Sequence, residues 1–228
     1  PDVVVHAGAW TAVDACEADP DRAFRVNALG TRHVQEGARI VGARVCYVST
    51  DYVFDGTATT PYDEWATPNP VSVYGRSKRG GELELDPGAL VVRCSWVCGA
   101  TGRNFVKTML RLAAERDDIG VVADQWGCPT FTDDLAGAIH ALVVGRRSGL
   151  FHVTNQGPTT WYELARATLA AAGDRPGKIR AITTADYPTP ATRPAWSVLD
   201  NAALRLEGLP LLPPWQESLE RLVKELVA

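Results

Sequence analysis

The stretch RVCYVSTDYVFDG at residues 44–56, followed by YGRSK at residues 74–78, indicates most about the fold and chemistry of this chain. The apolar run is typical of a buried parallel strand. It ends in two hydroxyl side chains, Ser49 and Thr50. Tyr74 follows, and Lys78 stands four positions after it, so a helix would place both side chains on one face. A hydroxyl, a phenol and an ammonium placed together can hold a carbonyl oxygen and protonate it, and the ammonium favours ionisation of the phenol.

Apolar runs and helical periodicity alternate along the first two thirds of the chain. We expect strands at residues 3–5, 44–49, 89–93 and 149–154, and helices at residues 19–41, 71–85, 104–116, 133–144, 160–172 and 215–226. Asp19, the pair Asp133 and Asp134, and Thr160 are the expected N-caps of three of these helices. This alternation predicts an α/β fold with a doubly wound parallel sheet. The proline-rich stretch after Lys178 favours a smaller C-terminal lobe of loops over the site.

Composition narrows the class of protein. The chain has 228 residues, 46% hydrophobic and 22% charged, which is ordinary for a globular enzyme. A net charge of −4 favours neither nucleic acid nor an anionic membrane as partner, and no apolar run is long enough to span a bilayer. Five cysteines without metal-ligand spacing are expected to be reduced, buried thiols of a cytoplasmic protein, and the four scattered histidines are expected to be structural.

Several blocks, in this order, resemble the dTDP-4-dehydrorhamnose reductase family, within the extended short-chain dehydrogenase/reductase superfamily. They cover nearly the whole chain: residues 2–14, 26–28, 49–56, 73–78, 93–97, 104–110, 124–130 and 193–194. The resemblance implies a Rossmann-like fold whose N-terminal βαβ unit, with its glycine-rich phosphate loop, is absent from this chain. It also implies a dTDP-sugar substrate, NADPH or NADH as cofactor, and allows for Mg²⁺ and for a homodimer.

The resemblance assigns the reaction and the catalytic residues. A dTDP-4-keto-6-deoxy sugar, dTDP-4-dehydrorhamnose by the family's example, would be reduced at its C4 ketone to dTDP-L-rhamnose. Tyr74 would give the proton, Thr50 would hydrogen-bond the oxygen, and Lys78 would tune Tyr74 and orient the ribose. Two alternatives stay open: a reductase of a different nucleotide-linked 4-keto sugar, and a non-catalytic dinucleotide-binding regulatory subunit. An epimerase or dehydratase fits less well, because Asp51 is followed by Tyr52 where dehydratases carry an acidic pair.

Other residues are candidates for binding. The small residues Ala7, Gly8 and Ala9 follow the first strand and would let a cofactor approach closely, with Ser49, Tyr74 and Lys78 beside them. Substrate candidates are Thr50, Asp51, Trp96, Asn104, Gln125, Thr130 and Arg193. Three of these have a plain structural alternative: Asp51 as a turn residue, Trp96 as a core aromatic and Asn104 as a helix cap. Arg193 is the candidate for a nucleotide phosphate, because a guanidinium binds phosphate through two hydrogen bonds.

We divide the chain by these patterns into a dinucleotide-binding domain, residues 1–120 and 133–154, and a substrate-binding lobe, residues 121–132 and 155–228. We expect Thr50 and Tyr74 to point into one cleft whose walls include Trp96, the 125–130 loop and Arg193. His6, Trp10 and Cys98 depart from the family's usual residues, which leaves the sugar open.

Overall fold

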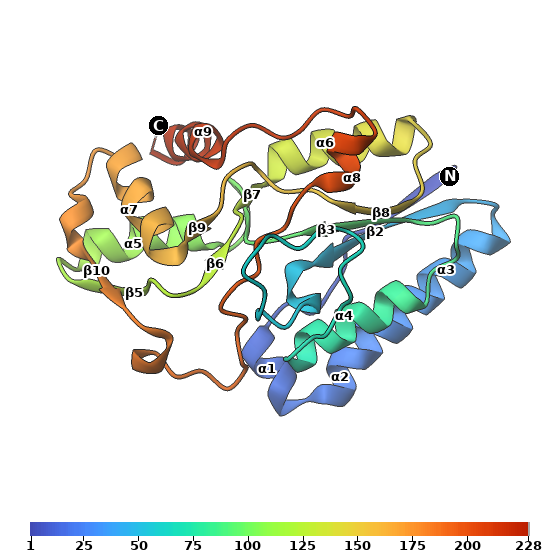
Figure 1. Cartoon of the computed structure of the whole chain (residues 1–228), viewed down its shortest axis with the longest axis horizontal. Coiled ribbons are helices and arrows are strands. Elements are labelled where there is room, and N and C mark those ends of the chain that lie inside the picture. Colours follow the sequence, from blue (N-terminus) through green and yellow to red (C-terminus); the bar gives the residue numbers. More distant parts are fainter. Residues whose placement is uncertain (228) are drawn as a thin grey trace.

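A four-stranded parallel sheet forms the centre of the larger part of the molecule (Figure 1). In this computed structural model, residues 1–227 are described. The strands are β1 (Val3–His6), β2 (Arg44–Thr50), β3 (Leu90–Cys94) and β8 (Gly149–His152), in the spatial order β1-β2-β3-β8. All three neighbouring pairs are parallel, so the expected α/β class and parallel sheet are confirmed.

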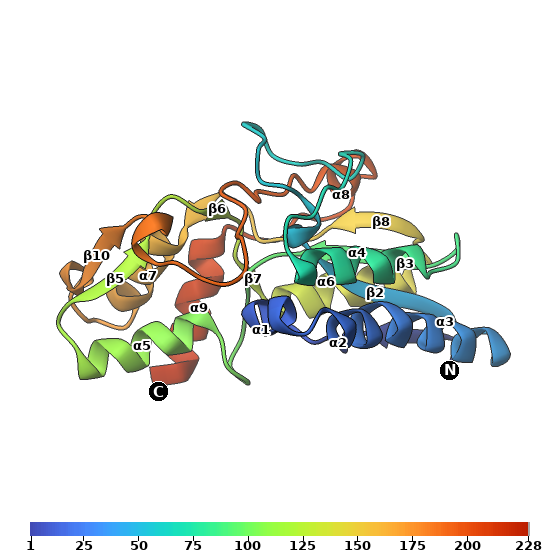
Figure 2. The same ribbon diagram turned by 90° about the horizontal axis from the view of Figure 1, so that it is seen from below.

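Helices cover both faces of this sheet (Figures 1 and 2). One face carries α1 (Val13–Ala18), α2 (Pro20–Phe24), α3 (Gly30–Ile40) and α4 (Val73–Leu83), and the other carries α6 (Thr132–Val144) and α8 (Ala202–Leu206). Val45 and Tyr47 of β2 are buried beside Ala38 of α3, whereas Cys46 is buried with Leu142 of α6. Alternate residues of β2 therefore enter two cores, which explains its continuous apolar sequence.

A second lobe lies beyond the carboxyl ends of the strands. It contains α5 (Phe105–Glu115), β5 (Ile119–Val122), α7 (Trp161–Ala171), β10 (Ile179–Ile182) and α9 (Trp215–Val227). β5 and β10 pair in parallel, and two short pairs lie between lobe and sheet: β4 (Val97–Cys98) with β7 (Thr130–Phe131), and β6 (Trp126–Gly127) with β9 (Thr159–Thr160).

The packing of two segments differs from the division that we made on sequence. α5 belongs to the lobe, because Met109 is buried with Leu169 of α7 and Ile179 of β10. Conversely, Leu204 and Leu212 are buried in the core between α6 and the sheet. Both placements depend on which apolar faces meet, which the order of elements does not show.

The predicted helix starts are mostly right. Asp19, Asn104 and Thr160 each accept a hydrogen bond from a backbone N–H of the first turn, as expected for N-caps. Asp133 and Asp134 do not cap α6, because that helix begins at Thr132 and they stand in its first turn. The helix expected at residues 19–41 is interrupted by a π-helical turn at Arg25–Leu29.

Helix α4 lies against β2 at a distance that only glycine permits. A methyl group at Gly75 would stand 2.1 Å from the carbonyl oxygen of Tyr52, and one at Gly81 would stand 2.4 Å from the hydroxyl of Tyr47. Both separations are far below van der Waals contact, so these two glycines set the spacing between the helix and the sheet.

A buried polar network fastens the same helix to the sheet. Glu82 of α4 accepts hydrogen bonds from Ser49 at 2.6 Å and from Arg93 at 2.8 Å through both carboxylate oxygens. Arg93 in turn lies 3.5 Å from Nε2 of His152, whose Nδ1 faces the carbonyl oxygens of Tyr62 and Asp200. Burial lowers the pKa of His152 to about 3, so its ring is neutral and structural, as expected.

We predict that Arg93→Met lowers the free energy of unfolding by about 3 kcal/mol, because it removes the buried cation of Glu82 and leaves only the partly exposed Arg79 as its ion-pair partner. The side chains of Arg93 and Glu82 are only 2% and 3% exposed. Arg111→Met is the matched control: its ion pair with Glu115 is largely exposed, so the loss should stay below about 0.5 kcal/mol. Urea denaturation of the three proteins measures both values, and equal losses would contradict the prediction.

Candidate active site

The carboxyl end of β2 and the first turn of α4 bring two hydroxyl groups together. Thr50 is the last residue of β2, and its side chain accepts a hydrogen bond from the Tyr52 backbone N–H at 3.2 Å. The Thr50 hydroxyl lies near enough to the phenol of Tyr74 to offset part of the effect of burial on its pKa. Tyr74 is buried beside Val73, Cys16 and the ring of Tyr52. The structure thus brings together the two hydroxyls that the sequence predicts would face one carbonyl oxygen.

Lys78 lies one helical turn behind Tyr74 and is buried. Its Nζ donates a hydrogen bond to the carbonyl oxygen of Val48 at 2.7 Å and sits 4.0 Å from the centre of the Tyr47 ring. Burial lowers the pKa of Lys78 to about 8. Burial also raises the pKa of Tyr74, so the easier ionisation that we expected from the Tyr74–Lys78 spacing is wrong for this arrangement.

Asp51 stands next to these hydroxyls and is 2% exposed. The Thr50 hydroxyl is 3.1 Å from Oδ1 of Asp51, and Oδ2 is a buried oxygen without a hydrogen-bond partner among the described residues. Burial raises the pKa of Asp51 to about 7. The carboxyl group therefore lies buried beside the Thr50 hydroxyl.

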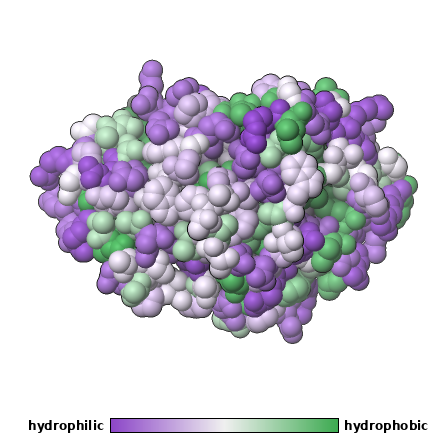
Figure 3. Space-filling view, viewed as in Figure 1, coloured by the Kyte–Doolittle hydropathy of each residue, from purple (hydrophilic) through white to green (hydrophobic). Residues whose placement is uncertain are grey.

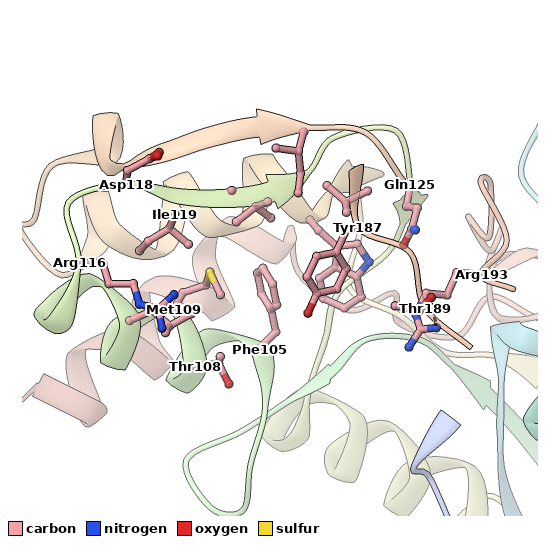
Figure 4. A pocket seen from close by; sticks show the side chains of 16 residues that line it. Phe105, Thr108, Met109, Arg116, Asp118, Ile119, Gln125, Tyr187, Thr189 and Arg193 are labelled. Carbon is pink, nitrogen blue, oxygen red and sulfur yellow. Dashed lines mark hydrogen bonds between the residues drawn. The ribbon is translucent and has the colours of Figure 1, made fainter. Parts of the chain in front are cut away.

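A pocket of about 440 Å³ lies in the lobe, between α5 and the β5–β10 pair. Figure 4 shows Gln125, Thr189 and Arg193 at one end, Arg116 and Asp118 at the other, and the rings of Phe105 and Tyr187 between them. Arg193 lies near Tyr52, whose ring meets the Tyr74 ring edge-on with centroids 5.7 Å apart. Arg193, at one end of the pocket, is thus directed toward the ring that contacts Tyr74, whereas Thr50 and Tyr74 do not line the pocket themselves.

Comparison with known proteins decides the family. The family described as RmlD substrate binding domain matches residues 1–228. The chain belongs to the dTDP-4-dehydrorhamnose reductase family. A dTDP-4-dehydrorhamnose reductase of Streptomyces griseus is 43% identical over 96% of this chain and 75% of its own length. A probable dTDP-4,6-dihydroxy-2-methyloxan-3-one 4-ketoreductase of Streptomyces antibioticus is 43% identical over 100% of this chain and 79% of its own.

Solved structures agree with this family. The crystal structure of dTDP-4-dehydrorhamnose reductase from Bacillus anthracis, in complex with NADP, superposes with a TM-score of 0.96 at 40% identity. The match covers 99% of this chain and 81% of that one. The Rossmann-like fold expected from the sequence is thereby confirmed.

Arg193 has a different environment from the one predicted. Its guanidinium binds both carboxylate oxygens of Asp14, at 2.8 and 2.9 Å, and also Thr189 and the Ala191 carbonyl oxygen. The two-pronged face that we assigned to a phosphate thus holds a carboxylate in this member of the family. Arg193 instead joins the C-terminal segment to α1.

Three other substrate candidates lie apart from the pocket lining. Trp96, with a left-handed φ of 49°, stacks on Trp161 at 3.6 Å between ring centroids. Thr130 is fully buried, and its hydroxyl accepts a hydrogen bond from the Ser95 N–H at 3.4 Å. Asn104 caps α5 and also donates to the Gly99 carbonyl oxygen at 2.7 Å. Of the lobe candidates, the structure brings Gln125 and Arg193 into one pocket.

The candidates for the cofactor lie along the carboxyl ends of β1 and β2. Ala7 and Gly8 are exposed directly after β1, and Ala9 is half-buried. Ser49 points to the opposite face from Thr50, as strand alternation predicts, and its hydroxyl is engaged by Glu82. Ala7, Gly8 and Ala9 thus line an open edge, whereas Ser49 is held in the core.

Sequence reasoning gave no role to Asn27. This buried side chain accepts a hydrogen bond from the Trp10 N–H at 2.8 Å and donates to the Trp10 carbonyl oxygen at 3.1 Å and to Ser77 at 2.9 Å. It therefore ties the loop after β1 to α4, from within the π-helical turn. In the sequence, this role is indicated by a polar residue that stands between the apolar residues Val26 and Ala28.

The thiols agree with the prediction from the sequence, because all five cysteines are free and buried. Residues 1–227 contain no group of three or more acidic, histidine or cysteine side chains arranged to hold a metal, so nothing in them supports Mg²⁺. Over the same residues, no helix has the length and apolar character that crossing a bilayer requires. The face drawn in Figure 3 carries polar residues throughout, with small apolar groups between them.

The lowered pKa of Lys78 predicts how stability depends on pH. Between about pH 8 and 10.5 the unfolded chain keeps a proton on this side chain that the folded protein has released. At this side chain the unfolded state then binds more protons, so Lys78 contributes a rise of the free energy of unfolding with pH across this interval. The buried thiols contribute a fall over the same interval, because burial raises their pKa. Lys78→Met should therefore make the measured slope more negative, whereas Lys224→Met, on the exposed side of α9, should leave it unchanged. Denaturant titrations at about pH 8 and pH 10 measure the slope, and an unchanged slope in Lys78→Met contradicts the assignment.

Proposed function

We propose that this protein reduces the C4 ketone of a dTDP-4-keto-6-deoxy sugar, converting dTDP-4-dehydrorhamnose to dTDP-L-rhamnose. The observation that carries the proposal is the Thr50–Tyr74 hydroxyl pair at the carboxyl edge of a parallel sheet, with the Lys78 ammonium behind it. Parallel sheets bind their ligands at this edge. The names of two relatives at 43% identity support reduction of a dTDP-linked keto sugar, and one of them is named for dTDP-4-dehydrorhamnose.

The chain's own residues perform the proton half of the reaction. Thr50 and Tyr74 hydrogen-bond the ketone oxygen, which orients the carbonyl and draws charge toward the oxygen. The reduced nicotinamide, when bound, supplies the hydride to the carbonyl carbon. Tyr74 gives its proton to the oxygen as the alcohol forms, which leaves a phenolate. The Lys78 ammonium, one helical turn away, favours that phenolate and opposes part of the much larger effect of burial, which raises the pKa of Tyr74.

The residues of the open edge fit a nicotinamide dinucleotide. The Lys78 ammonium has three N–H groups, and the Val48 carbonyl oxygen occupies one of them, which leaves donors for ribose hydroxyls. Ala7 and Gly8 are small and exposed beside the end of β2, where a flat ring can approach the backbone. NADPH is the form that we propose, because the Bacillus anthracis relative was solved in complex with NADP.

The lobe would hold the nucleotide part of the substrate. The pocket offers the flat rings of Phe105, Trp161 and Tyr187 to a base, and the amide of Gln125 to its polar edge. Within this proposal, α5, α7, β5 and β10 form the substrate-binding lobe, and the four-stranded sheet with its helices forms the dinucleotide-binding domain. Relatives of equal identity are named for different sugars, so we propose dTDP-4-dehydrorhamnose as the substrate and another nucleotide-linked 4-keto sugar as the alternative.

We predict that Tyr74→Phe lowers kcat at least about a hundred-fold and leaves the Kd for NADPH within about two-fold, because only the proton donor is lost. Reduction of dTDP-4-dehydrorhamnose followed by NADPH absorbance gives kcat, and quenching of protein fluorescence gives the Kd. A variant that keeps more than about a tenth of the wild-type kcat would contradict the role of Tyr74.

Tyr162→Phe is the matched control for this experiment. Tyr162 lies on α7, and its hydroxyl accepts a hydrogen bond from Arg166 at the surface at 2.8 Å. It loses the same atom as Tyr74→Phe in a place remote from the hydroxyl pair, so its kcat should match that of the wild type.

A further inference from the structure

The carboxyl group of Asp51 is buried beside the reacting hydroxyls without a cation. In residues 1–227 no lysine, arginine or histidine forms an ion pair with it. Its Oδ1 contacts the Thr50 hydroxyl, and its Oδ2 has no hydrogen-bond partner. A buried carboxylate in such a place is costly, whereas the neutral acid is far less so.

The groups around Asp51 do not supply a compensating positive charge. Tyr52 and Tyr74 lie on one side, from the turn after β2 and from α4, and Cys94 and Cys128 lie on the other, from the end of β3 and the loop before β7. The Ser197 hydroxyl is also near and opposes part of the effect of burial on the pKa of Asp51, although its hydrogen bond goes to the Trp126 carbonyl oxygen at 3.3 Å. All of these neighbours are neutral, and burial accordingly raises the pKa of Asp51 to about 7.

The protonation state of Asp51 decides where the Thr50 hydrogen points. A threonine hydroxyl has one hydrogen to donate and can accept two hydrogen bonds. One acceptor position of Thr50 is taken by the Tyr52 N–H. An ionised Asp51 can only accept, so it uses the single hydrogen of Thr50 across the 3.1 Å contact. A protonated Asp51 can donate across the same contact, which fills the second acceptor position and frees the Thr50 hydrogen.

From this arrangement we propose that Asp51 is a positioning residue which, in its neutral form, donates a hydrogen bond to Thr50 and so directs the Thr50 hydroxyl toward the substrate oxygen. This inference rests on the proposed reduction of a 4-keto sugar. With Thr50 saturated as an acceptor, the Tyr74 hydrogen is also free to meet the same oxygen. The neutral carboxyl thus prepares both donors for one acceptor.

The pH dependence of hydride transfer tests the proposal. The active form has Asp51 protonated, so the single-turnover rate should fall as the pH rises through about 7. Lys78, with its pKa lowered to about 8, adds a second fall at higher pH. In Asp51→Asn the amide can donate to Thr50 at every pH, so the first fall should vanish and only the one near 8 should remain. Asp51→Ala should lose about ten-fold in rate below pH 7, because the Thr50 hydroxyl is no longer oriented.

Glu64→Gln is the matched control, because Glu64 is a second buried carboxyl with one unpartnered oxygen. Its other oxygen accepts hydrogen bonds from the backbone N–H groups of His152 and Ala203, away from Thr50. The wild-type pH profile should therefore persist in Glu64→Gln. An Asp51→Asn protein whose rate still falls near pH 7 overturns the proposal.

A second measurement decides the matter if Asp51→Asn does not fold. Infrared spectra of the Glu64→Gln protein should show the band of a neutral carboxyl group, and this band should appear as the pH falls through about 7. We assign the band to Asp51, because the substitution removes the carboxyl group of Glu64. A protein without such a band overturns the proposal. If the wild type does not reduce the 4-keto sugar, the proposed function fails, and the infrared titration still reports the state of Asp51 separately.

Discussion

The close contact between helix α4 and strand β2 is the constraint on which the rest of the site depends. Gly75 and Gly81 let the helix backbone approach the turn after β2 and the Tyr47 ring, where a single added methyl group would overlap with them. At this spacing Glu82 reaches Arg93 and Ser49 in the core, and Lys78 reaches the Val48 carbonyl oxygen. Tyr74, at the start of the same helix, is then held beside Thr50.

The low-polarity surroundings that this contact creates have opposite effects on the acids and the base of the site. Burial raises the pKa of Tyr74 and Asp51 and lowers that of Lys78, because each charged form loses its hydration. The neutral phenol and the neutral carboxyl are proton donors. The site is therefore prepared to give hydrogen bonds and a proton to a ketone oxygen, which is what a carbonyl reduction requires.

The two parts of the molecule meet at the carboxyl edge of the sheet. The Asp14–Arg193 ion pair joins α1 to the C-terminal segment, and Arg193 also lines one end of the pocket. Trp96 stacks on Trp161 and joins the segment between β3 and β4 to α7 of the lobe. These long-range contacts align the lobe with the sheet.

The sequence by itself determined the features that depend on a few neighbouring residues. The parallel sheet and the caps at Asp19, Asn104 and Thr160 follow from strand and helix periodicity and from short polar side chains at helix starts. The shared face of Tyr74 and Lys78 follows from their spacing, whereas the choice of Thr50 over Ser49 came from the resemblance to the family.

Only the tertiary structure decided which side chains become partners. It gave Arg193 to Asp14, Ser49 to Glu82 and Asn27 to Ser77, and it left one oxygen of Asp51 without a partner. It also placed α5 in the lobe and raised the pKa of Tyr74 in spite of Lys78. Periodicity limits the backbone over a few residues, whereas burial and ion pairing depend on surfaces that meet only when distant segments pack together.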